Sequence, residues 1–97
     1  MARIHGNWCG PNWTAGQVKP ASDITAADMR VKCLDNLDCG CKQHDISIGT
    51  KGHSFATDEK LRRIAERESL RVWRPIYAMK ARMVAEAMAK SRWFRGR

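Results

Sequence analysis

Apolar and weakly polar side chains recur at helical spacing in the middle of the chain. Alternating steps of three and four residues place them on one face of a helix. This face consists of Leu34, Leu37, Cys41, His44 and Ile48. Asp35 and Asp38 have the spacing of a capping pair at its start, and Gly49 ends it. The pattern therefore predicts a helix over about residues 35–49.

A second helix is predicted over about residues 57–74. It opens at Thr57, and the carboxylate of Asp58 in its first turn complements the helix dipole. Pro75 should end or kink this helix, because proline cannot continue the hydrogen-bond ladder. A basic C-terminal helix then follows over about residues 76–94. Its methionines are interpreted as core residues: Met79, Met83 and Met88.

The first part of the chain reads as a loop. Glycine and proline interrupt regular structure repeatedly at Gly6, Gly10, Pro11 and Gly16. No segment shows a convincing strand pattern, and no internal repeat is visible. The prediction is one mainly α domain over residues 1–97 with two long helices, the second kinked or broken near Pro75.

The net charge of +8 is concentrated in the second half of the sequence. Residues 1–50 contain five Lys/Arg and five Asp, whereas residues 51–97 contain thirteen Lys/Arg and five Asp/Glu. Such a basic half attracts polyanions, either nucleic acid or an anionic lipid surface. A solvated helix face is the third interpretation, and charge alone does not separate the three.

Four cysteines in 97 residues predict two disulfides and an oxidising compartment. Cys33 and Cys39 bear on where the first helix begins. On one continuous helix they would be about 9 Å apart along the axis, too far for a disulfide. If they are bonded, the helix starts near Asp35. If they are not, it can run unbroken from Thr25, which also has a capping partner in Asp28.

Asp38, Cys41, His44 and Asp45 form the most informative cluster. Residues seven apart on a helix lie on nearly the same face, so Asp38 and Asp45 align. His44 lies about 100° around from Asp45, so the two side chains can flank one cleft. A histidine base beside a carboxylate that holds a metal suits metal-assisted ester hydrolysis. The alternative is a structural helix histidine.

The loop from Trp8 to Asn12 provides the second part of this hypothesis. Calcium takes roughly six to eight oxygen ligands, commonly backbone carbonyls together with a bidentate carboxylate. Gly10 can adopt backbone angles that turn neighbouring carbonyls toward an ion. A calcium site between this loop and the helix is therefore plausible on chemical grounds.

Together these segments resemble the secreted-type phospholipase A2 superfamily. Trp8-Cys9-Gly10 resembles its calcium loop, and the stretch from Asp38 to Asp45 resembles its Asp-x-Cys-Cys-x-x-His-Asp helix signature. Within the superfamily, the chain is most similar to the short phospholipase domains of parvoviral minor capsid proteins. That likeness lies in Gly10-Pro11-Asn12 and in the segment His53-Ser54-Phe55-Ala56-Thr57-Asp58.

The resemblance covers about residues 5–65 and implies calcium-dependent hydrolysis of the sn-2 acyl ester of glycerophospholipids. It implies that His44 is the base that activates water, that Asp58 orients this base, and that Asp45 is the bidentate ligand of Ca²⁺. The calcium loop would span about residues 5–16. The remaining calcium ligands would be the carbonyls of Trp8, Gly10 and Asn12. The Gly10 N–H would be the oxyanion donor.

Several positions depart from the superfamily pattern. Gly40 replaces the first Cys of the usual pair, Asn12 replaces a glycine, and Ile48 replaces a tyrosine that supports the orienting carboxylate. Tyr77 is the only tyrosine in the chain. The distance along the chain from Gly10 to His44 is longer than in the viral domains, so residues 17–34 are interpreted as containing an insertion.

Of the three possible cysteine pairings, Cys9–Cys41 with Cys33–Cys39 is favoured. The first bridge would tie the loop to the helix one turn before His44. The rival hypothesis is a zinc-stabilised nucleic-acid-binding module with the ligands Cys33, Cys39, Cys41 and His44. Helical spacing disfavours it, because Cys39 and Cys41 lie about 200° apart around a helix. A catalytically inactive relative that binds membranes is the third alternative.

The expected partner is an anionic phospholipid bilayer, with no specific nucleic acid. The basic half would bind it together with Trp73, Trp93 and Phe94. The expected localisation is secreted or virion-associated, acting at membranes. Residues 1–20 lack the apolar core of a secretory signal peptide.

Overall fold

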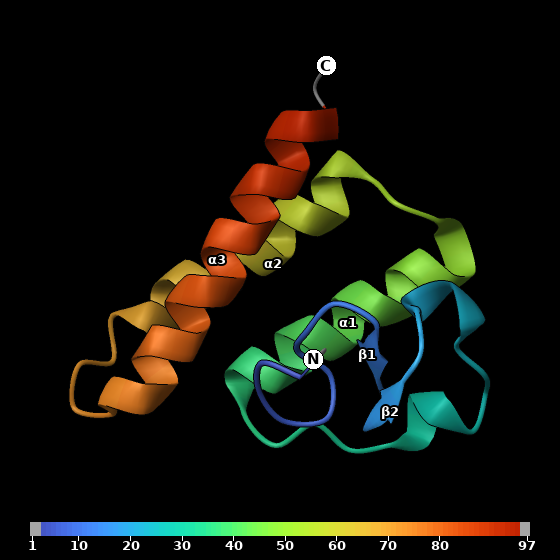
Figure 1. Ribbon diagram of the computed structural model, residues 1–97, viewed down its shortest axis with the longest axis horizontal. Coiled ribbons are helices and arrows are strands. Elements are labelled where there is room, and N and C mark those ends of the chain that lie inside the picture. Colours follow the sequence, from blue (N-terminus) through green and yellow to red (C-terminus); the bar gives the residue numbers. More distant parts are fainter. Residues whose placement is uncertain (1–2, 96–97) are drawn as a thin grey trace.

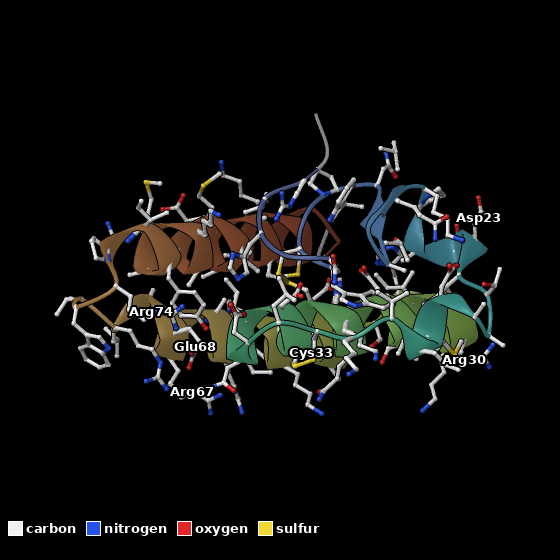
Figure 2. The ribbon with its side chains drawn as sticks, turned by 90° about the horizontal axis from the view of Figure 1, so that it is seen from below. Asp23, Arg30, Cys33, Arg67, Glu68 and Arg74 are labelled. Atoms are coloured by element: carbon white, nitrogen blue, oxygen red, sulfur yellow. A yellow bond between two sulfur atoms is a disulfide. The ribbon has the colours of Figure 1, made fainter. Side chains whose placement is uncertain are left out.

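A computed structural model describes the backbone of residues 3–95 and the side chains of residues 3–90. Three helices dominate it: α1 (Asn36–Lys51), α2 (Phe55–Ser69) and α3 (Pro75–Arg95). In Figure 1, α2 and α3 lie side by side, and the N-terminal loop lies against α1. Figure 2 shows two layers, with α3 and the N-terminal segment above α1 and α2. The mainly α class predicted from the sequence is confirmed.

The first long helix begins directly after Asp35. The Asp35 side chain accepts a hydrogen bond from the backbone N–H of Asp38 at 2.9 Å, as an N-cap does. Thr25 and Asp28 also cap each other through their side chains, at 2.9 and 3.2 Å. This pair stabilises the start of the short 3₁₀ turn η2 (Asp28–Arg30), and the long helix α1 does not begin at Thr25.

Gly49 does not end α1, contrary to the prediction. The helix continues to Lys51, and its C-cap is Gly52 with a φ of 80°. Gly49 lies where the 3₁₀ turn η1 (Ala21–Asp23) packs against the helix. A Cβ at Gly49 would be 2.2 Å from the Ile24 side chain and 2.7 Å from the Ala21 carbonyl. Glycine is needed here for close approach rather than for chain reversal.

The structure also contains a small β-hairpin that the sequence did not predict. Strands β1 (Trp13–Thr14) and β2 (Gln17–Val18) are antiparallel and only two residues long. Ala15 and Gly16 connect them with positive φ angles of 55° and 75°, as a primed hairpin turn requires. Strands this short leave no room for an alternating hydrophobic pattern.

The second helix begins two residues before the predicted start and ends five residues before the predicted end. Ser54 is its N-cap and accepts from the Thr57 N–H at 3.1 Å. Ser69 is its last residue. Pro75 breaks the helical run and becomes the first residue of α3, a position that tolerates its missing N–H.

The core lies between α3, α1, α2 and the N-terminal loop. Its largest members are Trp8, Leu37, Leu61, Tyr77 and Val84. Met79 and Met83 do not belong to it, contrary to the prediction, because their side chains are 56% and 46% exposed. Met88 packs partly buried against the core. No helix among the described residues is long and apolar enough to cross a membrane.

Two disulfides fix the N-terminal half, with the pairing favoured from the sequence. Cys9 bonds Cys41 and Cys33 bonds Cys39, with Cα–Cα distances of 5.2 and 4.9 Å. The first joins the N-terminal loop to the middle of α1. The second joins Cys39, near the start of α1, to Cys33, which lies before the helix. None of the described cysteines is free, so none offers a thiolate to zinc.

Candidate active site

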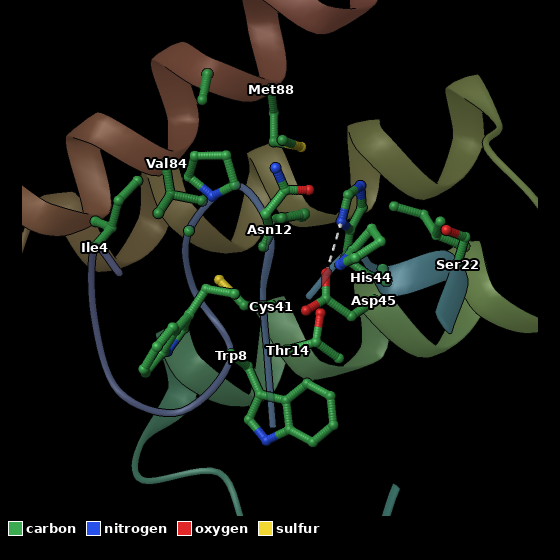
Figure 3. A pocket seen from close by; sticks show the side chains of 18 of the residues that line it. Ile4, Trp8, Asn12, Thr14, Ser22, Cys41, His44, Asp45, Val84 and Met88 are labelled. Atoms are coloured by element: carbon green, nitrogen blue, oxygen red, sulfur yellow. Dashed lines mark ion pairs between the residues drawn. The ribbon is translucent and has the colours of Figure 1, made fainter. Parts of the chain in front are cut away.

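A cavity of about 560 Å³ lies between the N-terminal loop, α1 and α3 (Figure 3). Most of its surface is apolar. Prominent apolar side chains in its wall are Ile4, Trp8, Ile48, Leu61, Val84 and Met88. His44 and Asp45 from α1 contribute polar groups to the same wall. Thus the histidine and the carboxylate predicted from the sequence open onto one largely apolar cavity.

His44 lies between two carboxylates. Its Nε2 atom is 2.7 Å from Oδ1 of Asp58 on α2, and its Nδ1 atom is 3.8 Å from Oδ1 of Asp45. Asp58 is 1% exposed, and the other two side chains are also buried. An ionised carboxylate can only accept, so Nε2–H donates to Asp58 and the neutral ring keeps its lone pair on Nδ1. That nitrogen faces Asp45 in Figure 3.

Asp45 has a buried oxygen, Oδ2, with no hydrogen-bond partner among the described residues. Buried polar atoms are nearly always satisfied, and an exception calls for a specific explanation. Burial raises the pKa of Asp45 to about 6, although the His44 imidazole works in the opposite direction. A cation beside Oδ2 would satisfy this atom and favour the charged carboxylate.

The pKa of His44 responds to the same surroundings. Burial lowers it, but the flanking carboxylates of Asp45 and Asp58 outweigh burial, so the pKa lies above its usual 6.5. His44 therefore has the contacts of an oriented base: Asp58 holds its Nε2 atom, and its Nδ1 atom faces Asp45. A cation held by Asp45 would reduce that carboxylate's pull on the imidazole proton.

The predicted calcium loop and Asp45 line the same cavity. Gly10, Pro11 and Asn12 contribute to its wall, and the Cys9–Cys41 bond holds the loop beside α1. Gly10 has a φ of 142° and Asn12 a φ of 52°. Asparagine is among the few non-glycine residues that tolerate a left-handed conformation. Asn12 can therefore hold this left-handed turn although it is not a glycine.

Two of the three predicted carbonyl ligands already accept backbone hydrogen bonds. The Gly10 carbonyl accepts from the Trp13 N–H at 3.3 Å, and the Asn12 carbonyl accepts from the Lys19 N–H at 2.9 Å. A carbonyl oxygen has two lone pairs, so each can still offer one to an ion. Among the described residues, no group of three or more His, Cys, Asp or Glu side chains could hold a metal. Any metal here would rely on one carboxylate and backbone oxygens.

Asp38 organises the loop, a role that the sequence reasoning did not assign to it. Its fully buried carboxylate accepts from the backbone N–H groups of Trp8 at 2.8 Å and Asn7 at 3.2 Å. It also accepts from the Leu34 N–H at 2.9 Å. The only sequence feature that pointed to Asp38 was its spacing of seven residues from Asp45, which puts both on one face of α1. On that face, the Asp38 carboxylate lies under the loop and the Asp45 carboxylate lies in the cavity wall.

Tyr77 joins α3 to Glu68 and to the start of α1. Its hydroxyl donates to Glu68 at 2.6 Å and accepts from the Leu37 N–H at 3.2 Å. Burial and the Glu68 carboxylate raise the pKa of Tyr77 to about 12. Ile48 adds apolar surface to the cavity.

The predicted membrane-binding residues are only partly visible. Trp73 lies in the turn between α2 and α3 with its side chain exposed. The side chains of Trp93 and Phe94 lie outside the described residues.

Comparisons with protein families, with curated proteins and with solved structures find no match to this chain.

Proposed function

We propose that this protein is a calcium-dependent phospholipase A2 that hydrolyses the sn-2 acyl ester of glycerophospholipids. The observation that supports it best is the placement of His44, held by Asp58 at 2.7 Å beside the incompletely satisfied Asp45. The sequence resemblance names the same three residues. Because α1 and α2 contribute separately to this group, chance adjacency along the chain does not explain it.

His44 would act as the general base at Nδ1. The Asp58 carboxylate fixes the tautomer, so Nδ1 can accept a proton from water as it attacks the ester carbonyl. The imidazolium that forms is stabilised by the Asp58 carboxylate, which lies 2.7 Å from Nε2. The proton can then pass to the departing glycerol oxygen. Asp58 orients the base and need not itself change protonation state.

The residues present fit a calcium ion. Asp45 would hold it through its carboxylate, and Trp8, Gly10 and Asn12 would add backbone carbonyls. The buried Oδ2 atom of Asp45, which has no hydrogen-bond partner among the described residues, would be one of the ligand atoms. When bound, calcium would polarise the ester carbonyl and stabilise the negative charge that develops on it. The Gly10 N–H is the proposed second donor to this charge.

The cavity suits a lipid better than a polar metabolite. Apolar side chains from the loop, α1, α2 and α3 form most of its wall, so burying an acyl chain there is favourable. The polar groups of the catalytic cluster lie on the α1 side of this apolar space. This division matches an ester with a long hydrocarbon tail.

The deciding experiment measures release of fatty acid from phospholipid labelled separately at sn-1 and sn-2, with calcium and with a chelator. Calcium-dependent sn-2 release is expected, and it should be abolished by His44→Gln. Gln43→Ala is the matched control, because Gln43 is exposed on the same helix and does not line the main cavity. Release that persists in His44→Gln, or that ignores the chelator, would contradict the proposal.

A binding-only relative remains the alternative outcome of this experiment. Asn12 departs from the superfamily pattern in the proposed calcium loop. Ile48 departs from it at the position whose tyrosine supports the orienting carboxylate. Calcium binding without any hydrolysis in the wild type would indicate that alternative.

A further inference from the structure

The outer face of α3 carries an exposed apolar stripe. Ile76, Met79 and Met83 are spaced by three and four residues, so they lie on one side of the helix. Trp73 and Val72, in the α2–α3 turn that precedes α3, are also exposed, Trp73 at 69%. We call these five residues the α3 stripe.

The fold does not use the α3 stripe. The opposite face of α3 already packs on the core through Tyr77, Ala81 and Val84. A helix that is apolar on both faces normally has a partner on each of them. Large exposed apolar patches usually mark contact with another protein or a membrane.

The charges around the α3 stripe favour an anionic partner. Residues 70–90 contain five Lys/Arg, of which Arg71 pairs with Glu68 at 2.8 Å, and a single acidic residue, Glu86. The exposed Arg74 lies in the turn, with its guanidinium 4.2 Å from the centre of the Tyr77 ring. Two copies of the chain meeting through this face would bring their cations together, which costs energy. An anionic lipid surface provides the complementary charge and accepts the apolar side chains.

We infer that the α3 stripe is the surface through which this protein inserts into an anionic phospholipid bilayer. Its tryptophan and methionines would enter the boundary between headgroups and acyl chains, and the flanking cations would contact lipid phosphates. The next residue in the same helical register is Ala87, which lines the cavity together with Met88. The stripe therefore leads from the α2–α3 turn to the cavity. This last step, a lipid path into the cavity, rests on the proposed function.

The test measures sedimentation with vesicles of ether-linked phosphatidylglycerol or ether-linked phosphatidylcholine in calcium-free buffer, so that no hydrolysis can occur. The wild type should bind phosphatidylglycerol vesicles preferentially and lose binding as salt rises. The double variant Met79→Gln with Met83→Gln should weaken partitioning by about tenfold. The control is Val18→Gln with Leu34→Gln, which removes two exposed apolar side chains elsewhere and should change partitioning by less than about twofold.

Three results would overturn the inference. They are binding that ignores lipid charge and salt, equal losses in the two double variants, and a dimer in sedimentation velocity that only the stripe variant dissociates. Circular dichroism of each variant checks that it is folded. Hydrolysis of a dispersed short-chain phospholipid reports on the His44 site alone. If that hydrolysis fails while stripe-dependent binding persists, the proposed function falls and the inference stands.

Discussion

The carboxylate of Asp38 accepts the backbone N–H of Trp8 at 2.8 Å, which joins α1 to the start of the predicted calcium loop. The same carboxylate also accepts from Asn7 and from Leu34. It lies directly against Gly6, where a Cβ would come within 2.4 Å of the carboxylate carbon. The loop conformation therefore depends on one fully buried acceptor.

Asp38→Asn should lower stability and disorganise the loop. The new amide would present an NH₂ group to backbone donors, which leaves at least one buried donor unpaired at a cost of about 1–3 kcal/mol. Urea unfolding followed by circular dichroism measures this loss. Asp23→Asn, at an exposed position of η1, is the control and should be close to neutral. Equal stability of the two variants would contradict the role given to Asp38.

Removing the two disulfides should have unequal effects. Cys9–Cys41 spans 32 residues and Cys33–Cys39 spans 6. The chain-entropy relation assigns about 3.7 kcal/mol to the longer loop and about 2.2 kcal/mol to the shorter one. The double alanine variant of the first pair should therefore unfold at lower urea concentration than that of the second. The reverse order would show that the shorter bridge stabilises α1 through more than loop closure.

Gly49→Ala should destabilise the protein although alanine is the better helix former. The added Cβ would lie 2.2 Å from the Ile24 side chain and 2.7 Å from the Ala21 carbonyl, so η1 must move away from α1. Overpacking of this kind costs about 1–3 kcal/mol. Thr50→Ala, at the next and exposed position, should change the midpoint of thermal unfolding little. A Gly49→Ala variant as stable as the wild type would mean that η1 is not packed as described.

Asp28 should contribute stability that disappears only in strong acid. The Lys19 ammonium, followed by the Thr25 N–H, lowers the pKa of Asp28 from 3.8 to about 2. A depressed folded-state pKa stabilises the fold fully above the unfolded value, and this stabilisation is lost as the pH falls through the folded value. The stability difference between wild type and Asp28→Asn should thus stay constant down to about pH 4 and shrink toward about pH 2. Urea unfolding at several pH values measures it, and a difference independent of pH would exclude the ion pair as its source.

Local signals in the sequence predicted the helix boundaries that local chemistry determines. The cap at Asp35 and the break at Pro75 both depend on residues within a few positions along the chain. Gly49 was misjudged, because the contact that requires it comes from η1. Met79 and Met83 were misjudged for a related reason. A helix with two apolar faces gives no indication in its sequence of which face is buried.

The candidate site was predictable in composition but not in geometry. The spacing of His44 and Asp45 placed them beside one cleft, and the resemblance supplied Asp58. The 2.7 Å contact between His44 and Asp58 depends on how α1 packs on α2, which no local pattern states. The role of Asp38 beneath the loop was missed because its partners are backbone N–H groups, which carry no sequence signature.

Calcium affinity should fall in mild acid, because the ion and a proton compete for Asp45. Burial raises the pKa of this carboxylate to about 6, so it is mostly ionised at pH 7 and mostly protonated at pH 5. For a single competing proton, the calcium dissociation constant should rise about tenfold between those pH values. Isothermal titration calorimetry measures this change, and Asp45→Asn should bind too weakly to show it.

His44→Gln is the discriminating control, because it removes the other group that titrates nearby. If binding keeps its pH dependence in His44→Gln, the proton belongs to Asp45. If the dependence vanishes there, His44 carries the proton and calcium is not held through an ionisable Asp45.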